Sequence, residues 1–171
     1  MLNKLYKIRD IDNIMHKSKI IEALKFLGCI LLSLSAGFIG MIFTVTGPES
    51  WYSQLIKPSF NPPNWLFGPV WTTLYILMGI ALYLVLKKKN TKRAKILFIS
   101  QLILNTLWTI IFFGMHNPLL AFIEIIILWT AILLTIQEFR KKSLAAAYLL
   151  IPYLLWVSFA SILTLAIYLL N

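Results

Sequence analysis

Acidic residues and cysteine are both scarce in this 171-residue chain. It has 6 Asp and Glu residues against 16 Lys and Arg residues, and its one cysteine is Cys29. A lone cysteine forms no intramolecular disulfide and completes no cysteine-based metal site. Zinc-ligand spacings, phosphate-binding glycine loops and nucleophile motifs are missing as well. We therefore predict no metal site and no required cofactor, and the residues by themselves give no direct support for an enzyme.

Charged residues of both signs make up only 13% of the chain, whereas 60% of its residues are hydrophobic. A soluble domain is typically about 45–50% apolar. Apolar runs of about 20 residues recur along the sequence, which is typical of membrane-spanning helices. The sequence therefore predicts an integral membrane protein, with a prokaryotic cell membrane as the expected location. The net charge of +10 then indicates membrane orientation or contact with anionic lipids, and not a nucleic-acid partner.

The hydrophobic runs predict an all-α membrane protein built as a bundle of five transmembrane helices. Residues 1–25 are predicted to be a basic N-terminal extension that can form an interfacial helix, and residues 26–171 form the membrane domain. Pro152 lies inside the last run and is expected to kink that helix. The five predicted helices cover residues of about 26–45, 65–86, 96–115, 119–139 and 144–170.

Lys and Arg residues are distributed very unequally between the two predicted membrane faces. One face carries 6 in the N-terminal segment, 6 in the loop 87–95 and 3 in the loop 140–142, and the other face has only Lys57. Positively charged loops stay in the cytoplasm. This 15-to-1 division predicts a cytoplasmic N-terminus and a C-terminus outside.

The stretch from residue 51 to residue 75 is rich in proline and aromatic residues. Proline fixes φ and lacks an N–H group, so the part between Pro58 and Pro63 cannot lie inside a helix, whereas Pro69 suits a first helical turn. The aromatic rings need burial, which predicts a structured lid between the first two helices and not a mobile linker. The predicted lid residues are Pro58, Phe60, Pro62, Pro63 and Trp65.

Three of the predicted helices place aromatic and amide side chains at helical spacing. Polar groups at membrane depth need partners, so these faces should point into the bundle. Such rings can simply fill a core or form interface belts. Small residues and amides among the indoles instead favour a cavity for a large, flat, mostly apolar ligand. The faces comprise Trp71, Tyr75 and Gly79; Gln101, Asn105, Trp108 and Phe112; and Tyr153, Trp156, Ala160 and Thr164.

Glu124 is the one acidic residue well inside a predicted span. A charge at that depth is costly, so the carboxyl group must be paired, protonated or facing water. Two interpretations stay open: it belongs to the ligand site or a proton-linked step, or it bonds to a neighbouring helix, for example to Trp108. Trp129, five residues further on, is expected to face lipid or a neighbouring helix.

Small residues recur four positions apart in the first predicted helix, as Ser33 with Gly37 and Ala36 with Gly40. Such pairs let two helix backbones approach closely in lipid. They serve either packing within the monomer or a homodimer interface, and the sequence leaves both open.

Five motifs give the chain a family resemblance. In order they are WYSQLIKPSFNPPNW, FGPVWTTLY, QLILNTLW, FF close to NP, and PYLLWVSFA. This order and spacing resemble the TspO/MBR family, the tryptophan-rich sensory proteins of microbes that are related to the mitochondrial translocator protein. The resemblance covers about residues 30–171 and implies a five-helix bundle, often dimeric, with a pocket closed by the loop after the first helix.

The resemblance also implies a ligand, because family members bind porphyrins and haem, sterols in some lineages, and isoquinoline and benzodiazepine drugs. It leads to the expectation of a tetrapyrrole receptor or carrier with its pocket beneath residues 48–65. The alternatives are a porphyrin-degrading protein with Trp71 and Trp156 as candidate catalytic residues, a regulatory membrane scaffold, and a sterol- or lipid-binding protein. The implied ligand-binding residues are Tyr52, Trp71, Tyr75, Asn105, Trp108, Glu124, Trp156 and Ala160.

The chain departs from the family pattern in two places. The first loop of the family often reads KPxW, whereas this chain has KPSF, so Phe60 replaces an indole. The sterol-recognition pattern of the animal proteins needs a late basic residue, and no Lys or Arg follows Lys142. Tetrapyrrole binding is therefore expected ahead of sterol transport.

Overall fold

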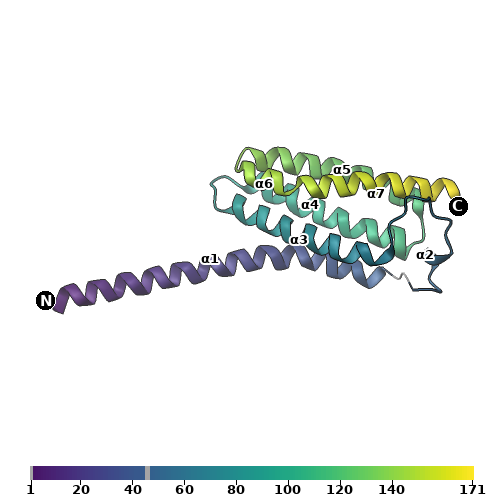
Figure 1. The fold of residues 1–171 in the computed structure, drawn as a ribbon. Coiled ribbons are helices and arrows are strands. Elements are labelled where there is room, and N and C mark those ends of the chain that lie inside the picture. Colours follow the sequence, from purple (N-terminus) through teal and green to yellow (C-terminus); the bar gives the residue numbers. More distant parts are fainter. Residues whose placement is uncertain (1, 45–46) are drawn as a thin grey trace.

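The computed structural model describes the backbone of residues 2–44 and 47–171, and the side chains within these ranges from Lys17 onward. The described residues form helices joined by short connections (Figure 1). In chain order the helices are α1 (Leu2–Phe43), α2 (Trp51–Gln54), α3 (Asn64–Leu86), α4 (Lys92–Thr109), the π-helical turn η1 (Ile110–Gly114), α5 (Pro118–Arg140), α6 (Leu144–Leu149) and α7 (Ile151–Leu170).

Five segments of the described chain are long and apolar enough to cross a membrane, which confirms the predicted five-helix membrane fold. Each consists of about 20 or more residues, the length that a bilayer core requires. The segments are Lys17–Phe43, Asn64–Leu86, Lys92–Gly114, Pro118–Arg140 and Leu144–Leu170.

The first helix differs from the prediction, because it does not begin near residue 26. α1 is one continuous helix of 42 residues, and its N-terminal part extends well beyond the other helices (Figure 1). No proline or glycine occurs before Gly28, so the sequence contains no residue that would end a helix between the extension and the span. The charges of the extension indicated a separate segment, but charged residues are compatible with an unbroken helix.

The later helices also differ in detail from the predicted bounds. The predicted helix at 96–115 begins at Lys92 and ends in the turn η1, where the Met115 N–H donates to the Ile110 carbonyl oxygen at 2.9 Å. The predicted helix at 144–170 is divided into α6 and α7 at Leu150, two residues before Pro152. Proline removes one backbone donor and crowds the preceding turn, which explains a break at this place.

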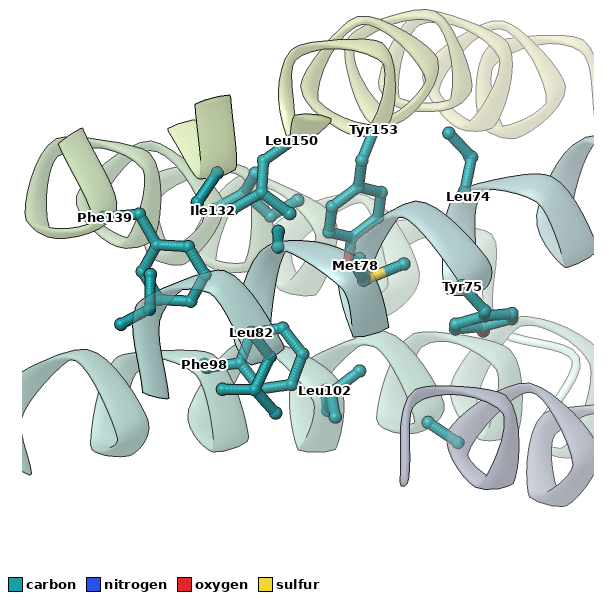
Figure 2. Packing of buried hydrophobic residues seen from close by; sticks show 14 of the residues in the cluster. Leu74, Tyr75, Met78, Leu82, Phe98, Leu102, Ile132, Phe139, Leu150 and Tyr153 are labelled. Carbon is teal, nitrogen blue, oxygen red and sulfur yellow. The ribbon is translucent and has the colours of Figure 1, made fainter. Parts of the chain in front are cut away.

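α3 forms the centre of the bundle core. Met78, Ala81 and Val85 on this helix are completely buried, and Tyr153 points from α7 toward Met78 (Figure 2). Toward the end of the bundle where α4 begins and α5 ends, the rings of Phe98 and Phe139 stack with their centroids 5.9 Å apart. Large side chains fill the core of this half of the bundle, whereas a cavity of about 550 Å³ lies in the other half.

The small residues of α1 are used for packing within the monomer. Ser33 and Ala36 are buried, and a Cβ atom at Gly37 would overlap the ring of Tyr75 on α3. On the facing helix, a Cβ atom at Gly79 would lie 2.6 Å from the Ile30 Cα. This close approach of α1 and α3 agrees with the first of the two interpretations of the small pairs, packing within one chain.

Candidate functional site

A cavity of about 550 Å³ lies at the end of the bundle where α1 connects through α2 to α3. Side chains from α1, α2, α3, α4, η1 and α7 line it. Six of the eight predicted ligand-binding residues are among the lining residues: Tyr52, Trp71, Tyr75, Trp108, Trp156 and Ala160.

The indole rings in the wall are held by other aromatic rings. Trp71 stacks on Tyr75, with a centroid distance of 5.6 Å and an interplanar angle of 28°. Trp108 stacks on Phe112 at 5.2 Å and 14°. Trp156 contacts Phe67 edge-on at 6.0 Å. Aromatic neighbours at these distances restrict the ring orientations, so the wall presents preformed π surfaces.

Asn105 does not line the cavity but lies directly behind its wall. It is 2% exposed, its Oδ1 accepts the hydrogen bond of the Tyr75 hydroxyl, and its Nδ2 donates to the Tyr153 hydroxyl at 3.2 Å. The amide therefore satisfies two phenols on two different helices. Asn105 thus links α4 to the cavity-lining Tyr75 on α3 and to Tyr153 on α7.

Glu124 also lies outside the cavity lining. Its side chain is 5% exposed, and neither carboxyl oxygen has a hydrogen-bond partner among the described residues. The proposed bond from Trp108 is not formed, because the Trp108 Nε1 likewise has no partner there. A buried carboxyl group without a partner is expected to be protonated at membrane depth.

The connection between α1 and α3 is folded against the mouth of the cavity. Ser50 caps the short helix α2, with its Oγ accepting from the Ser53 N–H at 3.3 Å. Tyr52 is 4% exposed, and its hydroxyl donates to the Asn61 Oδ1 at 3.0 Å. Burial raises the pKa of the Tyr52 phenol above its ordinary value, which is itself well above neutral pH, so the hydroxyl stays a hydrogen-bond donor. Trp51 stacks on His116 at 4.6 Å and 15°.

The structure places the predicted lid residues around the cavity and not in its wall. Phe60 is 48% exposed and contacts Phe159 edge-on at 6.3 Å, while Trp65 is 72% exposed. Pro58, Pro62 and Pro63 are likewise not among the lining residues. The lining on this side comes instead from Tyr52, Asn64, Phe67 and Gly68. Phe67 precedes Trp71 by four residues on α3, so helical spacing was the signal that would have identified it.

Sequence analysis also missed an entire wall of the cavity. It is formed by five residues of α1, Leu34, Gly37, Phe38, Gly40 and Met41, and by Thr44, which directly follows this helix. Ordinary apolar side chains carry no chemical signal that separates a cavity wall from a lipid-facing surface. Only the small residues Gly37 and Gly40 mark this face in the sequence, and their spacing predicts helix packing, within the monomer or in a homodimer, and not a cavity. In η1 the structure adds Phe113, which lines the cavity beside Phe112.

The cavity is nearly without free polar groups. None of the described residues that line it carries a charge. Three of its hydroxyl groups donate to carbonyl oxygens of their own helices: Thr72 to Gly68 at 2.9 Å, Thr109 to Asn105 at 3.4 Å and Thr164 to Ala160 at 2.8 Å. A ligand therefore meets mainly aromatic and aliphatic surface, with the indole groups and the Asn64 amide as polar features.

Trp129 lies outside the cavity lining. Its Nε1–H donates to the Ser158 Oγ at 2.8 Å, which joins α5 to α7. Of the two expectations for this residue, contact with a neighbouring helix is the one that the structure shows.

Comparison with known proteins identifies similar sequences over the whole membrane domain. The model of the TspO/MBR family matches residues 29–170. A tryptophan-rich protein TspO of Archaeoglobus fulgidus is 49% identical over 150 residues, which cover 86% of this chain and 97% of that protein. The corresponding protein of Chlorobaculum tepidum is 50% identical over 148 residues, covering 84% and 93%. The human translocator protein is 38% identical over 136 residues, covering 77% and 80%.

Proposed function

This chain belongs to the TspO/MBR family of integral membrane proteins, and we propose that it is a tetrapyrrole receptor or carrier that binds porphyrin or haem in its cavity. One observation carries the proposal: a cavity of about 550 Å³ has Trp71, Trp108 and Trp156 in its wall. Small-molecule sites typically have volumes of about 300–1,000 Å³.

The shape and chemistry of the wall support a flat aromatic ligand. Indole rings provide large apolar contact areas and prefer stacked or edge-on arrangements with other π systems. The described lining carries no charge, which supports placing the apolar macrocycle in the interior. Carboxylate groups of a porphyrin would be costly there and belong at the mouth. Lys57 lies near the mouth, with its Nζ 4.8 Å from the ring centroid of the cavity-lining Tyr52.

Titration of the purified protein with protoporphyrin IX, followed by tryptophan fluorescence, tests this function. We expect a bound porphyrin to quench tryptophan fluorescence, because three of the six tryptophans line the cavity. Since the proposed site is this one cavity, the quenching should saturate at one porphyrin per chain. Quenching that rises without saturation, as for an inner-filter effect or partition into detergent, would contradict a specific site. The absorption spectrum of the bound porphyrin, followed in light and in darkness, distinguishes binding from degradation.

A further inference from the structure

The side chain of Asn171 joins the C-terminal end of α7 to the segment between α2 and α3 by hydrogen bonds. Its Oδ1 accepts a hydrogen bond from the Ile56 N–H at 2.9 Å, and its Nδ2 donates to the Ile56 carbonyl oxygen at 3.0 Å. The same Nδ2 donates to the Ile167 carbonyl oxygen at 2.9 Å. Figure 1 shows the C-terminus beside this connection. One amide group thus satisfies both backbone groups of a residue that lies 115 positions earlier.

Aromatic packing anchors the start of this segment, since Tyr52 is buried against Phe112 and Trp51 stacks on His116, but the chain around Ile56 has fewer contacts. The Ile56 side chain is 61% exposed, so it contributes little apolar anchoring. Nearby polar bonds are local, since Ser53 donates to the Pro48 carbonyl and Lys57 donates to the Ser53 and Leu55 carbonyls. Within the described residues, the two bonds to Asn171 are the only hydrogen bonds that link residues 50–59 to anything beyond the connection 47–63.

The bonds also lie next to the cavity. Tyr52, four residues before Ile56, and Ile167, whose carbonyl accepts from Asn171, both line the cavity and belong to one buried cluster. Asn171 therefore bonds to the connection on one side and to the bundle wall on the other.

We propose that Asn171 is a positioning residue that fastens residues 50–59 across the cavity mouth and thereby slows the release of ligand. This inference rests on the proposed ligand-binding function of the cavity. A ligand that enters or leaves beside Tyr52 requires residues 50–59 to move, and such movement breaks the two bonds to Ile56. The rival explanation is that Asn171 only satisfies the last turn of α7 through its bond to Ile167.

Amide hydrogen exchange in the ligand-free protein separates these explanations, because the Ile56 N–H is itself a donor in the proposed contact. A hydrogen-bonded amide exchanges its hydrogen with solvent only when the local structure opens and the bond breaks, so its exchange rate reports the frequency of that opening. Loss of two partly exposed bonds in Asn171→Ala should accelerate exchange at Ile56 by about 5- to 30-fold. Asn171→Asp keeps the acceptor and loses both donated bonds, so its exchange rate should lie between those of the wild type and the alanine variant.

The control variant is Gln54→Ala, which removes an exposed amide side chain from the same connection and should leave exchange at Ile56 unchanged. Circular dichroism verifies that each variant keeps its helix content. If Asn171→Ala accelerates exchange only in the last turn of α7 and not at Ile56, the residue is a helix cap and the proposal is wrong.

Stopped-flow release of protoporphyrin IX then tests the effect on ligand. Asn171→Ala should raise the dissociation rate constant by about 5- to 30-fold, with a smaller change in the association rate constant. An unchanged dissociation rate in a variant with accelerated Ile56 exchange would overturn control of release. If the wild-type protein does not bind porphyrin, the proposed function fails, whereas the exchange experiment still decides whether Asn171 fastens the connection.

Discussion

At the scale of single residues, the cavity depends on indoles that stack and can also donate a hydrogen bond. Trp71 and Trp156 line the cavity from α3 and α7, and each is in contact with a further aromatic ring. Phenylalanine keeps most of the stacking and removes the N–H donor, whereas alanine removes both. Substitution at these two positions therefore separates the two contributions to ligand affinity.

We expect the phenylalanine variants of Trp71 and Trp156 to bind protoporphyrin IX about 2- to 13-fold more weakly, which corresponds to loss of one hydrogen bond of about 0.5–1.5 kcal/mol. The alanine variants should lose about 1–3 kcal/mol, if the stacking of bases on aromatic side chains is a fair comparison. Equilibrium titration by porphyrin absorbance measures both, since absorbance does not depend on the number of tryptophans that remain.

Trp129→Phe is the matched control for these variants. It removes an indole donor of the same kind, the bond to Ser158, from a residue outside the cavity lining. Its stability in detergent should fall by about 0.5–1.5 kcal/mol while its porphyrin affinity stays unchanged. Equal affinity of the folded Trp71→Ala, Trp156→Ala and Trp129→Phe variants would show that the cavity is not the binding site.

Gly79 is a position at which adding a side chain should have a large structural effect. A methyl group there would lie 2.6 Å from the Ile30 Cα and 2.9 Å from the Cys29 carbonyl oxygen, and backbone atoms cannot rotate away. Gly79→Ala should therefore destabilise the protein by about 1–3 kcal/mol, because it forces α1 away from α3. Unfolding in a denaturing detergent measures the loss.

Gly28→Ala serves as the comparison, because a Cβ atom at Gly28 would meet nothing within 4 Å. This variant should be at least as stable as the wild type, since alanine favours helix by about 1 kcal/mol relative to glycine. If both variants lose the same stability, the contact between α1 and α3 is not as close as the structure places it.

At the scale of elements, the sequence predicted the helices well and the connection between them only in part. Long apolar runs and basic loops indicated all five spans. Distinctive side chains at helical spacing also indicated the cavity faces of α3, α4 and α7. The α1 wall was missed because Phe38 and Met41 resemble lipid-facing residues, and only contacts with other helices separate the two roles. Trp65, predicted as a lid residue, is 72% exposed, and a proline-rich segment does not reveal the direction in which the helix that follows it begins.

The proline-rich segment after α2 should nevertheless affect ligand kinetics through its stiffness. Proline limits the number of conformations that the segment can adopt when it detaches from the bundle. Each replacement by glycine should therefore destabilise the ordered conformation of the segment by about 0.4–1 kcal/mol. The double variant Pro62→Gly and Pro63→Gly should release protoporphyrin IX about 4- to 30-fold faster, with a smaller effect on binding. Stopped-flow fluorescence measures both rates.

Ser59→Gly, an exposed position in the same segment, controls for added glycine. Its release rate should change by much less than that of the double variant. If all these proteins release the porphyrin at the same rate, the segment does not govern exit from the cavity.

At the scale of the whole molecule, the basic residues gather at the end of the bundle opposite the cavity. The loops after α3 and α5 lie at that end, and the C-terminus lies at the other (Figure 1). Because positively charged loops stay in the cytoplasm, we propose that the N-terminus is inside and that the cavity opens toward the outer side.

Labelling with a membrane-impermeant thiol reagent tests this orientation after Cys29→Ser removes the one native cysteine. In intact cells, Ser59→Cys should react and Lys89→Cys should react only after lysis, since both positions are exposed but lie at opposite ends of the bundle. The reverse pattern would place the cavity mouth in the cytoplasm.

The unbroken length of α1 places its N-terminus far from the cavity. At about 1.5 Å per residue, Leu2 lies about 42 Å along the helix from Ile30, where α1 touches Gly79, whereas Gly37 in the cavity wall lies only about 10 Å away on the other side. α1 contacts the bundle on both sides of Ile30, through the Tyr83 hydroxyl bond to Glu22 at 3.1 Å and the close packing of Gly37 on Tyr75. The helix is therefore clamped along the bundle and free only beyond it, so a fusion partner attached near Leu2 would stand clear of the membrane domain and of the cavity.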